Sequence, residues 1–214
     1  DRPIAVRYAR GLLGLHLAGV ERPSRQRAAI REEHLQIDAE TRHLNHLIGD
    51  LLVFARPSHE ERRDVRVSVL VEDALRDVRA QTRTAVPAEL DVDASLVVRC
   101  ESEALRRAVA QVIENAATAA SGEPLVIRAR PREKKELVLE VIDPGEGMDT
   151  AVRKRALEPF FTTRPYGTGL GLAIVARVAR AHGGRVDIES AHGRGTTVSL
   201  TLPRVTEPVP EARS

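Results

Sequence analysis

The chain has 214 residues, a formal net charge of +2 and only 2% aromatic residues. This length suits two small domains, and the near-balanced charge argues against electrostatic binding of nucleic acid. The single cysteine, Cys100, excludes a disulfide framework and a cysteine zinc site, and no run of about 18 apolar residues predicts a membrane span. Because the chain opens with Asp1-Arg2-Pro3, which does not resemble a signal peptide, we expect a cytoplasmic segment without direct membrane contact, whose parent protein could still be tethered to a membrane.

Residues 1–57 predict an antiparallel helical hairpin. Ile30, Ile37 and Leu44 recur every seven residues, which is typical of a coiled-coil seam. An amphipathic helix precedes them, and the glycine- and proline-containing stretch 19–23 separates the two. Apolar stripes along both helices predict a homodimeric four-helix bundle. The alternative is a hairpin that packs on the rest of its own chain.

The remainder predicts one α+β domain. Residues 58–64 are expected to form a charged linker, residues 65–204 the domain, and residues 205–214 a disordered tail rich in Pro and Glu. Apolar periodicity predicts helices over 69–81, 103–120 and 170–181, and strands over 65–68, 89–92, 96–100, 125–130, 136–142, 185–189 and 196–202. This mixed order fits an α/β sandwich with helices on one face of a sheet.

Two polar segments of this domain suit ligand chemistry. Gln111 and Asn115 lie one helical turn apart, and the amide oxygen of Asn115 suits a hard cation such as Mg²⁺. Asp143 ends a strand and could accept a hydrogen bond from a ligand amine, while Gly145 and Gly147 give the turn after it conformational freedom. A surface asparagine and an ordinary glycine-rich turn are the alternatives.

Two further segments follow. One reads Glu158-Pro-Phe-Phe-Thr-Thr-Arg164, in which the adjacent phenylalanines could pack a mobile loop and the arginine could face a phosphate. The other reads Gly167-Thr-Gly-Leu-Gly-Leu172 at a helix start, where backbone N–H groups can approach an anion. Its spacing fits neither the dinucleotide fingerprint nor the P-loop, and ordinary loop anchoring is the alternative for the first segment.

In their order and spacing, the four segments resemble the N, G1, F and G2 boxes of bacterial sensor histidine kinases, most closely the nitrogen-regulator branch. The resemblance extends through Pro203 and back into the hairpin, where Asp50-Leu-Leu-Val-Phe-Ala-Arg-Pro57 is similar to the usual end of that element. It implies a dimerisation and histidine-phosphotransfer hairpin followed by an ATP-binding domain of the Bergerat type. It also implies that the chain binds Mg-ATP and passes the γ-phosphoryl to a histidine, for relay to an aspartate of a response regulator.

The resemblance also assigns site residues. Asp143 would bind the adenine amino group, Asn115 would hold Mg²⁺ with Glu114 beside it, and Arg164 would contact the γ-phosphate; these last three form the expected catalytic set. A flexible lid would span residues 144–168. The full expected ATP-binding set is Asn115, Asp143, Gly145, Gly147, Phe160, Thr163, Arg164, Gly167, Thr168, Gly169, Leu170, Gly171 and Thr196.

Gln111 distinguishes among relatives of the wider fold, and the start of the chain departs from the family pattern. Gln111 stands where ATPases and serine kinases of the wider fold carry a glutamate base, which favours a histidine acceptor over hydrolysis. No histidine of this chain has the phosphoacceptor context, and Pro3-Ile4 matches the end of that motif, so we expect the acceptor just before residue 1. Arg2 replaces the Thr or Asn of phosphatase-competent relatives, which leaves phosphatase activity open. The alternatives are a nucleotide-binding signalling scaffold that does not phosphorylate itself and an ATP-hydrolysing clamp, which Gln111 disfavours.

Overall fold

The computed structural model describes residues 61–82, 85–133, 135–164 and 167–206. The hairpin expected over 1–57 and most of the expected tail lie outside the described residues. In chain order the elements are β1 (Arg63–Arg66), α3 (Val67–Thr82), β2 (Ala88–Val92), β3 (Val97–Cys100), α4 (Ser102–Ala120), β4 (Leu125–Glu133), β5 (Glu136–Asp143), α5 (Thr150–Arg155), α6 (Gly171–Ala181), β6 (Arg185–Ser190) and β7 (Thr196–Pro203). None of the helices among the described residues has the length and apolar character that crossing a membrane requires.

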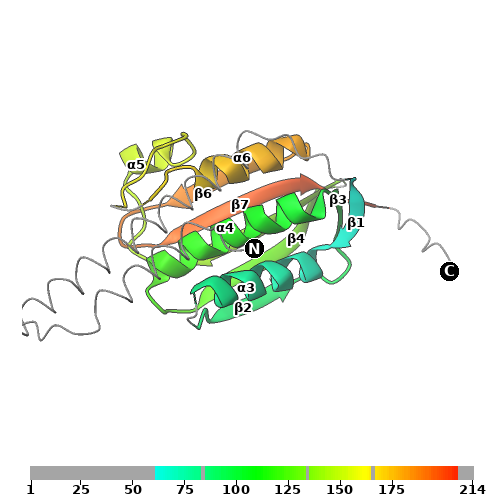
Figure 1. Cartoon of the computed structure of the whole chain (residues 1–214), viewed down its shortest axis with the longest axis horizontal. Helices are drawn as coiled ribbons and strands as arrows, with labels where there is room; N and C mark the ends of the chain where they lie inside the picture. Colours follow the sequence, from blue (N-terminus) through cyan, green and yellow to red (C-terminus); the bar gives the residue numbers. More distant parts are fainter. Residues whose placement is uncertain (1–60, 83–84, 134, 165–166, 207–214) are drawn as a thin grey trace, which may run out of the picture. The chain divides into compact units, whose positions relative to one another are not determined.

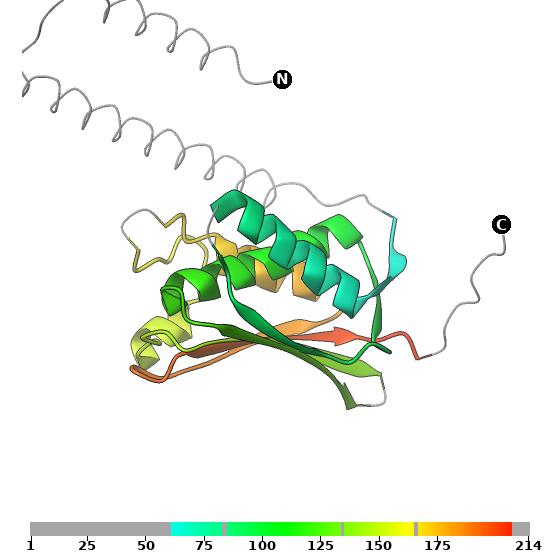
Figure 2. The ribbon, with the colours of Figure 1, turned by 90° about the horizontal axis from the view of Figure 1, so that it is seen from below.

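The domain has two layers, as the α+β prediction required. A five-stranded sheet has the order β2-β4-β5-β7-β6, and β1 pairs with β3 in a separate two-stranded sheet. β2 and β4 run parallel, whereas the other neighbouring strands of the large sheet are antiparallel. The helices α3, α4 and α6 lie side by side on one face of this sheet, with α4 in the middle (Figures 1 and 2).

The helical layer forms because each helix has an apolar face. In α4 the buried side chains recur at helical spacing, from Leu105 through Val109 and Val112 to Ala116. The buried residues of α3 follow the same pattern, and α6 is apolar over a wider arc. Burial of these side chains against the sheet supplies most of the favourable free energy that holds the layers together, at roughly 25 cal/mol per Å² of apolar surface.

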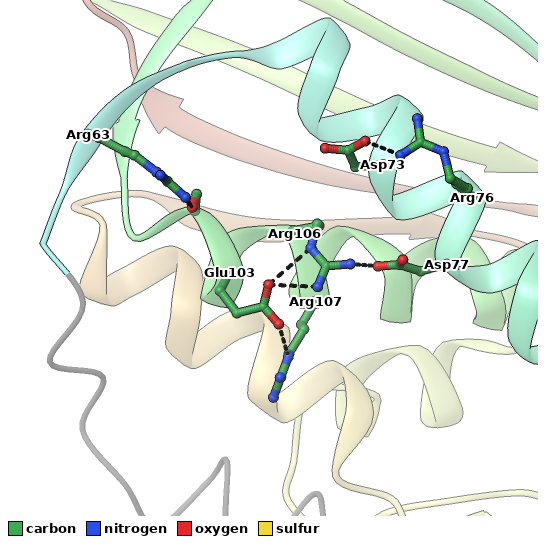
Figure 3. A network of polar contacts seen from close by, with 8 residues as sticks. Arg63, Asp73, Arg76, Asp77, Glu103, Arg106 and Arg107 are labelled. Carbon is green, nitrogen blue, oxygen red and sulfur yellow. Dashed lines mark hydrogen bonds and ion pairs between the residues drawn. The ribbon is translucent and has the colours of Figure 1, made fainter.

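A network of charged side chains joins α3 to α4 (Figure 3). Arg106 of α4 forms ion pairs with Asp77 of α3 and with Glu103 of its own helix, the latter at 2.6 Å. Glu103 also pairs with Arg107 at 2.7 Å. These groups are partly exposed to water, so each pair contributes about 1 kcal/mol or less to stability. The buried apolar contacts of the core contribute more.

The sheet places one carboxylate on its helix-covered face. Along β5, buried residues alternate with half-buried ones, and Leu137, Leu139 and Val141 belong to the core. Asp143 is the next residue in this alternation and is also buried. The strand register therefore directs an acidic side chain toward the helices, at the end of the strand.

Three stretches differ from the sequence prediction. α3 begins at Val67, directly after β1, although a strand was expected through Ser68. β4 continues to Glu133 because an irregularity between Pro131 and Glu133 lets the strand pass a residue that has no N–H to donate. α5 forms inside the expected lid, where the Asp149 side chain caps the helix by accepting a hydrogen bond from the Val152 N–H at 2.8 Å.

Candidate functional site

A cavity of about 440 Å³, open to solvent, is lined by α4, the adjoining ends of β5 and β7, and the segments that lead into α5 and α6. Its volume lies in the usual range for small-molecule sites. The expected site residues that line it are Glu114, Asn115, Asp143, Gly147, Thr163, Arg164, Gly167, Thr168, Gly169, Gly171 and Thr196. Gly145, Phe160 and Leu170 are not among the lining residues.

Asp143 is a buried hydrogen-bond acceptor in this cavity. The residue is only 6% exposed, and its Oδ1 accepts a hydrogen bond from the Gly145 N–H at 2.9 Å. The Thr196 backbone N–H also donates to it. Burial raises the pKa of Asp143 above the ordinary value of 3.8, although these two hydrogen bonds and the positive charge of Arg164 act in the opposite direction. Two backbone donors do not use all the lone pairs of a carboxylate, so capacity remains for a ligand donor.

The turn after β5 is built closely around Asp143. Gly145 lies behind the carboxylate and orients it, instead of lining the cavity. Gly147 has a φ of 69°, and a Cβ there would overlap the Ala191 carbonyl oxygen. Only glycine therefore lets this turn pack against the loop that joins β6 to β7.

Asp143, Thr196 and Ser190 form a row across β5, β7 and β6. Thr196 is the register partner of Asp143 on one side and of Ser190 on the other. The Ser190 hydroxyl lies 2.9 Å from that of Thr196, accepts from the Met148 N–H at 2.8 Å and donates to the Gly195 carbonyl at 3.0 Å. Ser190 was not among the residues predicted from the sequence, because its place in this row depends on how β6 pairs with β7.

The opposite wall is the polar face of α4. Asn115 Oδ1 accepts a hydrogen bond from Arg164 Nη1 at 3.2 Å, and the Asn115 carbonyl accepts one from Arg164 Nη2 at 3.1 Å. One turn earlier, Gln111 Nε2 donates to Glu114 Oε2 at 3.4 Å. This wall therefore offers the cavity an amide oxygen and a carboxylate.

These oxygens fit a magnesium ion that is shared with a phosphorylated ligand. Mg²⁺ prefers oxygen ligands and in such sites commonly takes one or two of them from the protein, while phosphates and water supply the rest. Asn115 and Glu114 provide such a pair on the cavity wall. Among the described residues, no group of three or more His, Cys, Asp or Glu side chains could hold a metal ion alone.

Among the described residues that line the cavity, the aromatic one is Phe161, whereas Phe160 was expected. Phe160 is 64% exposed and has a φ of 66°, and its N–H donates to the Gly169 carbonyl at 2.9 Å. Phe161 lines the cavity, and the Arg155 guanidinium lies 4.2 Å from the centre of its ring. The left-handed turn at Phe160 separates the two neighbouring side chains, so that only one of them reaches the cavity.

The N-terminus of α6 forms the remaining side of the cavity. Gly169, with a φ of 67°, packs so closely on the Phe160 backbone that a Cβ would overlap it, and Gly171 starts the helix. Leu170 is completely buried, so it anchors this helix start and does not line the cavity. The first turn of α6 contains no acidic residue. Its N–H groups lack partners within the helix, and the helix dipole is positive here, so this end suits an anion.

The cavity therefore combines two kinds of surface. The end that β5 and β7 form presents hydrogen-bond acceptors, chiefly the Asp143 carboxylate. The N-terminus of α6 presents donors, and Arg164 is the one basic side chain among the described residues that line the cavity. A ligand with an amino-bearing ring and an anionic tail matches this combination.

Comparison with known proteins finds relatives of this chain. The family model described as histidine kinase-, DNA gyrase B- and HSP90-like ATPase matches residues 100–206. The signal transduction histidine-protein kinase AtoS of Escherichia coli (strain K12) is 33% identical over 179 residues, which cover 81% of this chain and 29% of AtoS. The nitrogen regulation protein NtrY of Azorhizobium caulinodans is 36% identical over 120 residues, which cover 52% of this chain and 16% of NtrY. The chain thus spans less than a third of either relative.

Solved structures share the fold. The mycobacterial sensor histidine kinase MprB is 30% identical with a TM-score of 0.61, over 67% of this chain and 97% of that one. Full-length ShkA, solved in complex with AMPPNP, has a TM-score of 0.70 over 89% of this chain and 41% of that one, and at 23% identity it shows the fold alone. The chain belongs to the histidine kinase-, DNA gyrase B- and HSP90-like ATPase family and, within it, to the bacterial sensor histidine kinases.

Proposed function

We propose that this chain is the kinase core of a sensor histidine kinase, which binds Mg-ATP and transfers the γ-phosphoryl to a histidine. One observation carries the proposal: a buried carboxylate, an oxygen-rich helix face and an open helix N-terminus line the same cavity. In phosphoryl transfer, the protein contributes chiefly positioning and charge neutralisation, and these are the groups that such a role requires.

Each side of the cavity has a role in binding. Asp143 accepts a hydrogen bond from the adenine amino group, next to Thr196. The N–H groups at the start of α6 bind phosphate oxygens, and Arg164 leaves Asn115 to contact the γ-phosphate. Asn115 and Glu114 would then hold Mg²⁺, which would supply positive charge against the phosphoryl oxygens.

In the transfer step, the bond between the γ-phosphorus and the bridging oxygen breaks as an imidazole nitrogen bonds to that phosphorus. ADP leaves with the bond electrons, and the imidazole N–H proton passes to solvent. A neutral imidazole is nucleophilic near neutral pH, so it needs no strong base. Gln111 fits this chemistry. It lines the cavity one turn from Asn115, and its amide cannot act as a base that removes a proton.

The partners belong to the same proposal. The hairpin expected over residues 1–57 joins two copies of the chain in a bundle, and the phosphorylated histidine donates to an aspartate of a response regulator. Support comes from the heptad pattern of the sequence and from membership of the sensor kinase family.

A nucleotide titration tests the binding site. Isothermal titration of the 214-residue chain with Mg²⁺ and a non-hydrolysable ATP analogue should give saturable binding. Asp143→Asn should weaken it at least about tenfold, because the acceptor of the hydrogen bond loses its charge and its second carboxylate oxygen becomes a donor. The matched control is Asp187→Asn, on the exposed side of β6 outside the cavity, which should bind as wild type does. Equal affinity of Asp143→Asn and wild type would show that the site is assigned wrongly.

Phosphotransfer is tested on the natural parent protein with γ-labelled ATP. The proposal predicts acid-labile, alkali-stable label on a histidine. Nucleotide binding without any label would favour the signalling scaffold. Steady hydrolysis without phosphohistidine would favour an ATPase.

A further inference from the structure

The cross-strand row of Asp143, Thr196 and Ser190 determines where one hydroxyl proton points. Ser190 has a single proton to donate, and the Gly195 carbonyl, which can only accept, lies 3.0 Å from its oxygen. The Ser190 oxygen also accepts from the Met148 N–H at 2.8 Å. One lone pair then remains on Ser190, and the Thr196 hydroxyl lies 2.9 Å away.

In this arrangement Thr196 must be the donor of the bond that it shares with Ser190. All hydrogen-bonding capacity of the Ser190 hydroxyl is then used. Thr196 lines the cavity and is only 8% exposed, so water has little access to rearrange the pair. With its proton committed to Ser190, the Thr196 hydroxyl offers the cavity lone pairs alone.

We propose that Ser190 is a positioning residue that turns the Thr196 hydroxyl into a pure hydrogen-bond acceptor, and thereby selects purines that carry an amino group over purines that carry a carbonyl in its place. The inference rests on the proposed nucleotide function and deepens it. Beside Thr196, the Asp143 carboxylate is a second acceptor, held by the N–H groups of Gly145 and Thr196. Two neighbouring acceptors favour an exocyclic amine and repel a carbonyl oxygen.

The test compares ATP with ITP, which has a carbonyl where ATP has its amino group. The affinities of the 214-residue chain for both nucleotides, with Mg²⁺ present, are measured by calorimetry. Wild type should prefer ATP. In Ser190→Ala the Thr196 hydroxyl can rotate and donate into the cavity, so the preference should fall about tenfold, in keeping with the loss of one directed hydrogen bond. Ser190→Cys, which keeps the size but bonds weakly, should show the same trend.

Two variants separate this role from simple support of the loop. Ser190→Thr keeps the hydroxyl and should restore the preference for ATP. Ser199→Ala removes a serine from the middle of β7, outside the cavity, and should leave the preference unchanged. If Ser190 had a purely structural role, its loss would weaken the binding of ATP and ITP equally. The ratio of the two affinities would then stay as in wild type.

The outcomes distinguish the inference from the function on which it rests. If wild type prefers ATP and neither Ser190→Ala nor Ser190→Cys changes the ratio, the inference is wrong while the proposed function stands. If wild type binds neither nucleotide, both are wrong. A reduced ratio that Ser190→Thr restores supports the inference.

Discussion

At the scale of single residues, Asp143 carries a charge where water has little access. The alternation of β5 leaves no other direction for its side chain, and burial raises the pKa of the carboxyl group even though two backbone N–H groups donate to it. The folded state is therefore less stable than it would be with a neutral side chain at this position. Such a cost is common where a site is built for a ligand and not for the free protein.

This cost predicts how stability depends on pH. The pKa of Asp143 is higher in the folded chain than the ordinary 3.8 of the unfolded chain, so the folded state binds more protons between these two values. Its stability therefore falls as the pH rises through the raised pKa. The Asn side chain of Asp143→Asn does not titrate. The stability of this variant relative to wild type should therefore be greater at neutral pH than just below pH 3.8.

Urea unfolding of both proteins at the two pH values measures this difference. A difference that is the same at both values, or smaller at neutral pH, would mean that burial does not control the titration of Asp143. Together with weaker nucleotide binding, the predicted result would show a residue that serves the ligand at some expense to folding.

At the scale of elements, a comparison of two glycines in adjoining turns distinguishes the effect of backbone strain from that of steric overlap. Gly147 and Gly193 have φ values of 69° and 73°, but only Gly147 packs against a neighbouring carbonyl, whereas nothing lies within 4 Å of a Cβ at Gly193. Gly193→Ala should lose about 1–2 kcal/mol of stability for the left-handed backbone alone.

Gly147→Ala should lose at least twice as much as Gly193→Ala and should also lose nucleotide affinity, because the turn behind Asp143 must move. Thermal unfolding and calorimetric titration of the pair provide the comparison. Equal losses of stability in the two variants would exclude close packing of this turn.

His182, which is 5% exposed, connects the end of α6 to the start of α4. Its Nδ1–H donates to the Val178 carbonyl at 2.8 Å, and its Nε2 accepts from the Glu101 N–H at 3.0 Å, at the start of α4. Arg62 adds a bond from Nη2 to the Ala181 carbonyl at 2.6 Å. Only the neutral ring with its proton on Nδ1 satisfies both histidine bonds.

Loss of this connection should destabilise the domain. His182→Ala leaves the Glu101 N–H without its acceptor and should lower the free energy of unfolding by about 1–3 kcal/mol. His192→Ala, in the exposed turn between β6 and β7, is the matched control and should stay within about 0.5 kcal/mol of wild type. Similar urea midpoints for the two variants would show that the His182 bonds contribute little.

At the scale of the whole molecule, local periodicity predicted most of the described elements. The 3.6-residue repeat of α4 and the two-residue repeat of β5 follow from burial on one face, which neighbouring residues reveal by themselves. α5 was missed because its stretch was assigned to a flexible lid. Its signal was Asp149, a good N-cap residue directly before the helix.

Other features depend on contacts that the sequence does not display. The position of Ser190 beside Thr196 follows from strand register, and the outward direction of Phe160 follows from one left-handed residue. Leu170 lies inside a glycine-rich motif, yet its apolar side chain enters the core. A motif indicates which segments meet a ligand, but the backbone decides which side chains do.

In the proposed mode of binding, one nucleotide contacts both the turn after β5 and the start of α6. Amide NMR spectra of the 214-residue chain, recorded during titration with Mg²⁺ and a non-hydrolysable ATP analogue, test it directly. The amide signals of Gly145, Gly147, Gly169 and Gly171 should shift together, with a single dissociation constant. Shifts in only one of these segments, or separate constants for the two, would contradict it.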